Sequence, residues 1–446
     1  MTNNINQLAA DNIKALCISM VEEANSGHPG GPMGGADFMH ILYSEFMQFD
    51  PSDMFWPFRD RFFMDAGHLS TLLYAQQYLL GNYSEDDLRN FRQWGSVTPG
   101  HPEVDVARGI ENTSGPLGQG HAMGVGAAIA AKFLGAKFGT WMDHKVYGFI
   151  SDGGIQEEIS QGAGRIAGHL GLNNFIMFYD SNDVQLSTMT DEVTSEDTEM
   201  KYRAWGWNVI SIDGHDHDEI RNALKNANDE KHRPTLIIGK TIMGKGCMTA
   251  DNEMYEGYCE LHGKPIGATG ADYEATMKNL GADLDNPFAK YNDVEKFYLD
   301  TLNRKKLEAS EKKSEIKTWR DDNPKLAQKL EAFFSGESPE LDFESIIYKE
   351  NLATRSASSS VLGYLAEKVE NMIVSSADLS NSDKTDGFLK HTKSLKKGDY
   401  SGAFLQSGVA ELTMAALANG MGLHGGVIPV VATFFVFSDY MKPAIR

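Results

Sequence analysis

Three short apolar runs that lie far apart in the chain constrain its fold more than any other feature. They cover Val146–Ile150, Phe175–Tyr179 and Thr235–Gly239, and each is apolar on successive residues rather than on alternate ones. Such runs are typical of strands that are covered on both faces, as in parallel sheets. Helical segments such as Glu158–Leu170 and Asp218–Asn228 separate them. This alternation predicts an α/β fold with a mostly parallel sheet.

A second α/β unit is predicted after a change in composition. Residues 303–333 are charged, poor in β-branched residues and expected to be helical, which favours a connection between domains. Beyond it we expect helices at 358–370 and 411–421 and strands at 372–376 and 427–434. The predicted division is a first domain of residues 1–305, a linker of 306–340 and a second domain of 341–446. The chain stops as a helix begins after the last strand, so we expect the second domain to be incomplete, since an apolar sheet edge would otherwise face solvent.

Charge and cysteine content limit the partners and the compartment. The formal net charge of −21 disfavours nucleic acid and anionic membranes as partners, so a phosphorylated substrate would need a local cluster of cationic side chains and backbone N–H groups. No apolar run approaches the roughly 20 residues of a membrane span, and the N-terminus lacks the layout of a secretory signal. The three cysteines follow no metal spacing, which predicts reduced thiols in a cytoplasmic protein.

Two polar turns follow two of the predicted strands. Asp152, Gly153 and Gly154 come after the first apolar run, and Asn182 comes after the next. Both turns are expected at the carboxyl ends of parallel strands, where open α/β sheets bind ligands. An aspartate, an asparagine and a free carbonyl offer the oxygen ligands that Mg²⁺ or Ca²⁺ prefers, and the glycines let backbone N–H groups approach a phosphate. The alternative is a tight Asp-Gly-Gly turn beside an unrelated Asn-Asp turn.

Four histidines lie in short glycine-containing loop motifs. His28 lies in SGHPG, His68 in AGH, His101 in GHPE and His262 in ELHG. Imidazoles can transfer protons near neutral pH and hydrogen-bond to sugar hydroxyls or phosphate. Any one of these histidines alone would more often be a loop residue without a role. The match of all four motifs to one family, given next, favours a shared site.

These segments, with HPGGPMG, SGPLGQG and IDGHD, make the chain similar to the transketolase family nearly from end to end. The family's thiamine diphosphate motif is Gly-Asp-Gly followed by Asn at this spacing; Ser151 replaces its first glycine, and Glu158 replaces a glycine that usually follows the motif's glutamate. The resemblance implies a parallel-sheet thiamine diphosphate-binding fold with a complete pyrophosphate domain, a partial pyrimidine domain and no C-terminal domain. It implies reversible transfer of two-carbon ketol units between sugar phosphates, through the ylid of thiamine diphosphate, in the pentose phosphate pathway.

The resemblance also implies a role for each matching residue of the first domain. The implied ligands of the divalent ion, Mg²⁺ or Ca²⁺, are Asp152, Asn182 and the carbonyl of Val184. Those implied to contact the cofactor are His68, His262, Gly153, Asn182 and the segment Gly115, Pro116 and Leu117. His28, His101 and His262 are implied to face the substrate and take part in catalysis.

Further site residues are implied in the second domain. Glu411 in GVAELTM could be an ordinary first-turn residue favoured by the helix dipole; the family places a glutamate here against N1′ of the aminopyrimidine. Phe437, then Phe434 and Tyr440, are the candidates for stacking on that ring, although aromatics there are usually plain core. Arg355 and Ser382 match the family's substrate-phosphate residues.

The family builds each site from two chains, which implies a homodimer with shared active sites. Two other interpretations are a ketol transferase of the dihydroxyacetone synthase kind and a non-catalytic, truncated cofactor-binding fragment. Two patterns are discounted. The GxGxxG match at Gly420–Gly425 precedes a strand, whereas a dinucleotide fingerprint follows one. The stretch His215–Asp218 is interpreted as loop structure rather than as a metal site.

Overall fold

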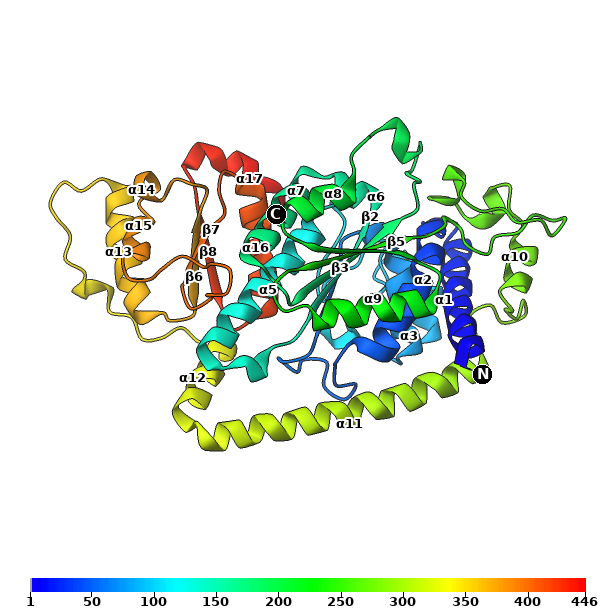
Figure 1. Ribbon diagram of the computed structural model, residues 1–446, viewed down its shortest axis with the longest axis horizontal. Helices are drawn as coiled ribbons and strands as arrows, with labels where there is room; N and C mark the ends of the chain where they lie inside the picture. Colours follow the sequence, from blue (N-terminus) through cyan, green and yellow to red (C-terminus); the bar gives the residue numbers. More distant parts are fainter. Residues whose placement is uncertain (1) are drawn as a thin grey trace.

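The first unit is built on a parallel sheet of five strands in the order β1-β2-β3-β5-β4. The computed structural model, which describes residues 2–446, is shown in Figure 1. The strands are β1 Arg61–Met64, β2 Val146–Ser151, β3 Phe175–Ser181, β4 Asn208–Asp213 and β5 Thr235–Lys240. The three predicted strands are therefore confirmed as β2, β3 and β5, whereas β1 and β4 were not predicted.

Helices cover both faces of this sheet. One hydrophobic cluster joins α5 and α7 to Val146, Ile150, Phe175 and Met177, and a second joins α1, α2, α3 and α9 to the intervening strand residues. Both faces are buried, which explains why β2 and β3 are apolar on successive residues. The helices are α1 Thr2–Ala24, α2 Gly30–Ile41, α3 Ser70–Leu79, α4 Glu85–Arg89, α5 Gln119–Phe138, α6 Asp152–Gln156, α7 Glu158–Leu170, α8 Thr198–Ala204, α9 His217–Asp229 and α10 Tyr273–Asn279.

The second unit has a parallel sheet of three strands in the order β7-β6-β8. Its elements are α13 Thr354–Lys368, β6 Met372–Ser376, α14 Ser380–Asp383, α15 Asp386–Leu389, β7 Phe404–Gln406, α16 Glu411–His424, β8 Ile428–Ala432 and α17 Ser438–Ile445. The predicted strand at 427–434 is shorter in the structure, so Phe434 follows the strand instead of ending it. The discounted GxGxxG stretch begins inside α16 and leads into β8.

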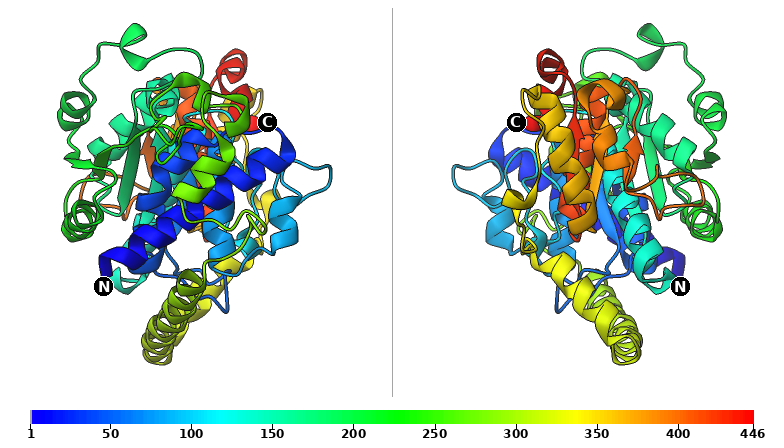
Figure 2. Two further views of the ribbon diagram at one scale, coloured as in Figure 1. Left: turned by 90° about the vertical axis from the view of Figure 1, so that its right-hand side faces the viewer. Right: turned by 90° about the vertical axis from the view of Figure 1, so that its left-hand side faces the viewer.

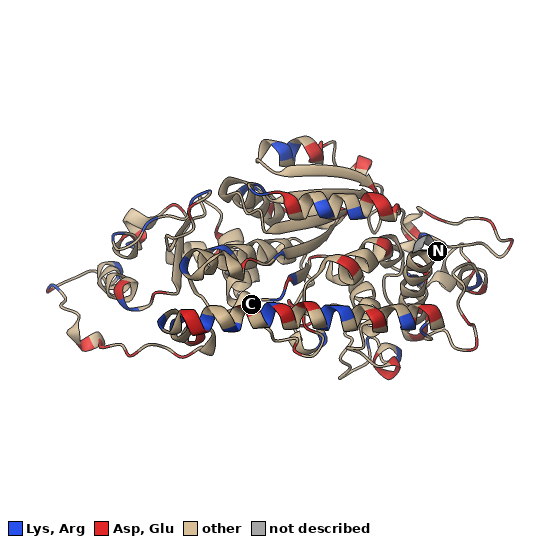
Figure 3. Ribbon diagram, turned by 60° about the horizontal axis from the view of Figure 1, so that its bottom comes forward, with Lys and Arg blue, Asp and Glu red and all other residues tan. Residues whose placement is uncertain are grey.

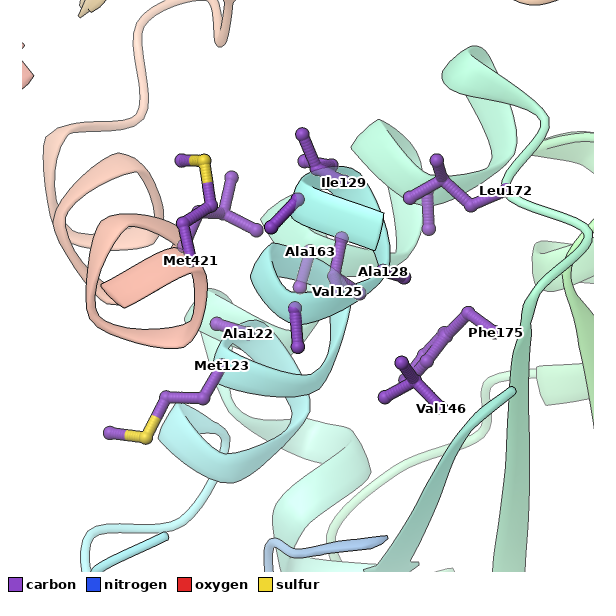
Figure 4. Packing of buried hydrophobic residues seen from close by; sticks show 14 of the residues in the cluster. Ala122, Met123, Val125, Ala128, Ile129, Val146, Ala163, Leu172, Phe175 and Met421 are labelled. Carbon is purple, nitrogen blue, oxygen red and sulfur yellow. The ribbon is translucent and has the colours of Figure 1, made fainter. Parts of the chain in front are cut away.

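Helix α16 packs closely on α5 and joins the two units (Figure 4). A Cβ atom on Gly126 would lie 2.0 Å from the carbonyl oxygen of Leu417, and one on Gly420 would lie 1.9 Å from that of Met123. Neither position has room for a side chain, so these glycines permit the two backbones to approach. Helix α5 is rich in glycine and alanine and is buried along most of its length.

A long charged helix connects the units along the outside of the molecule. The connection consists of α11 Asn292–Asp322 and α12 Pro324–Ser335, so its predicted helical character is confirmed. Helix α11 lies along the margin of the body in Figures 1 and 2, and acidic and basic residues are interspersed along it in Figure 3. Lys313 holds it by ion pairs to Asp50 (2.6 Å) and Asp53 (3.1 Å). The predicted boundary at 305 falls inside α11.

The remaining regular segments are short. They are 3₁₀ segments at Gly67–Leu69, Val106–Arg108, Thr140–Met142, Thr190–Glu192, Cys259–Leu261, Ile266–Ala268, Phe343–Ser345 and Phe435–Phe437, and a π-helical turn at Leu42–Phe46. Within residues 2–446, none of the helices has the length and apolar character needed to cross a bilayer.

Candidate active site

A cavity of about 540 Å³ lies at the carboxyl ends of β2 and β3. This is the position at which open parallel sheets bind ligands, and the volume lies within the roughly 300–1,000 Å³ of small-molecule sites. The predicted residues in its lining are His28, His68, His101, His262, Gly115, Leu117, Asp152, Gly153, Asn182 and Val184. Pro116 lies between two of these lining residues. The structure thus brings together the site residues predicted in the first domain.

Asp152 and Asn182 form the acidic end of the cavity. The Tyr179 hydroxyl donates to Oδ1 of Asp152 (2.5 Å), and the backbone N–H groups of Asn182 and Asp183 donate to its Oδ2 (3.1 Å each). Burial raises the pKa of the Asp152 carboxyl to about 6, although these hydrogen bonds oppose the rise. A bound cation would favour the ionised form, so the carboxyl suits a metal ligand.

The turn around Asp152 is held by the residue that departs from the family pattern. The hydroxyl of Ser151 accepts a hydrogen bond from the N–H of Gly154 (3.3 Å) and thereby caps α6. A Cβ atom on Gly153 would lie 3.0 Å from Leu117, so the backbone there faces the cavity without a side chain in between. The serine therefore keeps the turn and leaves this glycine available to a ligand.

Three imidazoles of the cavity lining pack against one another. Ring centroids lie 5.1 Å apart for His28 and His68, 5.7 Å for His28 and His262, and 5.3 Å for His68 and His262. Burial lowers the pKa of His28 and of His262 to about 4, and that of His68 well below its usual value, so all three are neutral near pH 7. Burial also lowers the pKa of His101, another lining residue.

The same imidazoles provide a test of whether the cavity fits a phosphorylated cofactor. Nδ1 of His28, Nε2 of His68 and Nδ1 of His262 are buried and have no hydrogen-bond partner. Buried polar atoms are usually paired. The three unpaired nitrogens therefore indicate a polar ligand whose groups would form the missing hydrogen bonds. An anion beside them would also raise their pKa values, since it stabilises the protonated form. The residues present therefore fit a diphosphate with a divalent cation.

The candidate metal ligands differ from the commonest protein metal sites. Within residues 2–446, no three His, Cys, Asp or Glu side chains are grouped so that they could hold a metal ion. The site predicted from the sequence instead combines one carboxylate, one amide oxygen and one backbone carbonyl. Such a set, completed by ligand oxygens, suits Mg²⁺ or Ca²⁺ rather than a transition metal.

The loop that carries Gly115 is fixed by Asp65, a residue that was not predicted from the sequence. The buried Asp65 carboxylate accepts hydrogen bonds from the N–H groups of Gly118 (3.0 Å) and His121 (2.9 Å). The hydroxyl of Ser114 donates to the Asp65 carbonyl (2.7 Å). Asp65 directly precedes the AGH motif of His68, and this adjacency was the available signal. Other lining residues that were not predicted are Gln156, Glu157, Asp180, Gln185, Ser187 and Met243.

The histidine pair beside the cavity-forming strands has a structural role. Nδ1 of His215 and Nε2 of His217 lie 3.0 and 2.8 Å from the carboxylate oxygens of buried Asp37. The interactions attach the loop after β4 to α2. This geometry agrees with the interpretation of the stretch His215–Asp218 as loop structure.

The site residues predicted in the second unit lie apart from this cavity. Glu411, Phe434, Phe437, Tyr440, Arg355 and Ser382 do not belong to the lining of the cavity. Arg355 and Ser382 lie together, since the Arg355 guanidinium donates to the Ser382 carbonyl (3.4 Å). Phe437 lies 6.1 Å from Phe434 and 6.3 Å from Tyr440 between ring centroids. The structure therefore forms two groups of candidate site residues, one on each unit.

A parallel α/β sheet that carries this cavity at its carboxyl edge defines an open α/β protein with a small-molecule site. The family model "Transketolase, thiamine diphosphate binding domain" matches residues 5–339, and "Transketolase, pyrimidine binding domain" matches residues 350–446. The chain belongs to the transketolase family.

Individual relatives agree with this assignment. A transketolase of Staphylococcus epidermidis is 39% identical over 456 residues, which covers 100% of this chain and 67% of that protein. The structure of transketolase from Leishmania mexicana has a TM-score of 0.93 at 33% identity and covers 99% of this chain and 66% of that one. A Pichia stipitis transketolase solved in complex with sedoheptulose-7-phosphate has a TM-score of 0.92 at 32% identity, with 99% of this chain and 66% of that chain covered. The chain thus spans about two thirds of the length of these relatives.

Proposed function

We propose that this protein transfers a two-carbon ketol unit from a ketose phosphate to an aldose phosphate with thiamine diphosphate and Mg²⁺, as in the pentose phosphate pathway. The observation that carries the proposal is the cavity in which Asp152 and Asn182 face three imidazoles with unpaired buried nitrogens. The sugar phosphate named for the Pichia stipitis relative supports the substrate class.

The first unit supplies the binding and proton-transfer groups. Asp152, Asn182 and the Val184 carbonyl hold the cation, and His68 and His262 offer their unpaired nitrogens to the diphosphate. When bound, thiamine diphosphate supplies an electron sink that permits cleavage of a carbon–carbon bond. His28 and His101 are neutral near pH 7, so each can donate one hydrogen bond to a sugar hydroxyl and accept another. They can therefore hold or move a hydroxyl proton at neutral pH.

The second unit is proposed to serve the cavity of a second copy in a cytoplasmic homodimer. Glu411 and the aromatic group Phe434, Phe437 and Tyr440 would then cover the cofactor ring, and Arg355 with Ser382 would bind the substrate phosphate. Two features support this arrangement. These residues lie outside the cavity of their own chain, and Tyr440 is 63% exposed beside exposed Phe435 and Val436. An exposed apolar patch of this kind marks an interaction surface. The free cysteines are compatible with a reducing compartment.

Calorimetry with thiamine diphosphate in the presence of Mg²⁺ tests the site. Asp152→Ala should abolish tight binding because it removes the anionic ligand of the cation. Asp183→Asn is the control, since this neighbouring carboxylate is exposed and pairs with Lys240, and asparagine tolerates the left-handed backbone at this position. Unchanged affinity in Asp152→Ala, or equal losses in both variants, would contradict the proposed site. Ketol transfer between phosphorylated sugars should be lost in Asp152→Ala and retained in Asp183→Asn.

A further inference from the structure

Asp180 is a buried carboxylate of the cavity wall that the proposed ligand set does not include. It lies near the end of β3, is 1% exposed and belongs to the cavity lining. Its Oδ2 accepts a hydrogen bond from Nδ2 of Asn182 (3.0 Å), and its Oδ1 accepts one from the Thr241 hydroxyl. Thr241 directly follows β5, the neighbour of β3, so the carboxylate is held from a second strand.

Asp180 and Val184 hold the two ends of the Asn182 amide. Oδ2 of Asp180 accepts a hydrogen bond from Nδ2 of Asn182, so the NH₂ end of the amide faces Asp180. The oxygen, Oδ1, then lies on the other side, where it accepts from the backbone N–H of Val184 (3.0 Å). A carbonyl oxygen has two lone-pair sites, so Oδ1 can still coordinate a cation. A rotated amide would instead present N–H groups to the cation.

We propose that Asp180 is a positioning residue that orients the Asn182 amide with its oxygen toward the divalent cation. The inference rests on the metal ligands of the proposed function. It extends them to a residue that is not itself one of the proposed ligands. Groups behind metal ligands commonly fix the orientation of those ligands and contribute to metal affinity.

The alternative role of Asp180 is to link β3 to β5 through Thr241. Three variants separate the two roles. Asp180→Leu removes the acceptor for both partners at similar volume. Asp180→Asn keeps both hydrogen bonds, since its amide oxygen can accept from Asn182 and its NH₂ can donate to the Thr241 hydroxyl. Thr241→Val removes only the link between the strands.

The experiment measures Mn²⁺ binding at saturating thiamine diphosphate, with free Mn²⁺ quantified by electron paramagnetic resonance. Asp180→Leu should weaken Mn²⁺ binding by roughly 10–100-fold, the usual loss when a partner behind a metal ligand is removed. Asp180→Asn should retain the wild-type affinity, and Thr241→Val should lose less than Asp180→Leu. Thermal unfolding without metal or cofactor reports whether each variant is folded, and Asp180→Ala replaces the leucine variant if the latter is not.

Each outcome supports or overturns a separate statement. Wild-type Mn²⁺ affinity in Asp180→Leu, with binding lost in Asn182→Ala, would overturn the orienting role and leave the ligand set intact. Equal losses in Asp180→Asn and Asp180→Leu would also overturn it, because the negative charge rather than the hydrogen bond would then matter. If Asp152→Ala and Asn182→Ala both bind Mn²⁺ as tightly as the wild type, the proposed ligand set itself fails.

Discussion

His121 is a buried histidine on α5 whose replacement by leucine should stabilise the protein. Its side chain is 2% exposed, lies parallel to Phe175 at 5.9 Å between ring centroids and meets Trp207 edge-on at 6.3 Å. Both ring nitrogens are buried and have no hydrogen-bond partner. An unpaired buried polar atom costs about 1–3 kcal/mol, whereas leucine fills the same space with carbon. We expect His121→Leu to raise the free energy of unfolding at pH 7 by about 2–4 kcal/mol.

The stabilisation should grow as the pH falls. Burial lowers the pKa of His121 to about 3 in the folded state, whereas an unfolded imidazole titrates near about 6.5. Between these values the unfolded chain binds a proton that the folded chain does not, so acid favours unfolding. At pH 5 the penalty is about 2 kcal/mol, from roughly 1.4 kcal/mol for each pH unit below the unfolded pKa. His121→Leu removes this penalty, so its advantage should be about 2 kcal/mol larger at pH 5 than at pH 7.

Denaturant unfolding followed by tryptophan fluorescence at pH 7 and pH 5 measures both effects. His169→Leu is the matched control, because His169 is exposed on α7 and its replacement removes no buried unpaired nitrogen. Other buried histidines, His40 and His144 among them, also destabilise the wild type in acid, but they are common to all variants compared. An equal change in unfolding free energy at both pH values would refute the depressed pKa. If His121→Leu does not raise the free energy of unfolding at pH 7, the claim that the His121 nitrogens have no hydrogen-bond partner is wrong.

Three further substitutions test the helix crossing and the proposed roles of the second unit. Gly420→Ala should destabilise the protein by about 3 kcal/mol, since its Cβ would lie 1.9 Å from the Met123 carbonyl; Gly422→Ala, with nothing nearer than 4.0 Å, should change the unfolding midpoint little. Arg355→Ala should raise KM for a phosphorylated ketose more than for hydroxypyruvate, and equal increases would contradict a phosphate contact. Glu411→Gln should slow hydrogen–deuterium exchange at C2 of bound thiamine diphosphate by about 10²–10⁴-fold with little loss of cofactor affinity, and a wild-type exchange rate would contradict its role.

The strands that the sequence missed, β1, β4 and β7, were missed for separate reasons. β2 and β3 are buried along their whole length, which leaves an uninterrupted apolar run in the sequence. β4 is the last strand of its sheet and alternates in burial, and β7 has only three residues. β1 begins with Arg61, whose buried guanidinium donates to the carbonyls of Arg59 (2.7 Å) and Pro57 (3.0 Å). The apolar run that follows this charge, Phe62–Met64, has three residues, fewer than the four to eight that indicate a buried strand.

The candidate site shows a similar division. Asp152 and Asn182 could be predicted because each directly follows a recognisable strand, and position on a parallel sheet then places them together. The groups that orient them could not be predicted in the same way. Asp65 and Asp180 act through hydrogen bonds to a distant loop and to a neighbouring side chain, and neither contact leaves a periodic pattern. Such contacts depend on side-chain orientation, which spacing along the chain does not specify.

The packing of α16 supports the proposal that Glu411 acts on another copy of the chain. Three close contacts fix this helix: Gly420 on Met123, Leu417 on Gly126, and Thr413 on Gly162, where an added Cβ would lie 2.2 Å from the threonine hydroxyl. Helices packed backbone to backbone have little freedom to shift, since interiors are close-packed. Glu411 lies two residues before Thr413, so its backbone is held by the same packing. It does not belong to the lining of the cavity in its own chain. A carboxylate that is fixed outside the cavity of its own chain fits the proposed shared site, in which a second chain presents the cofactor to it. Isolated monomers that exchange C2 hydrogen at the rate of an associated pair would therefore contradict the shared site.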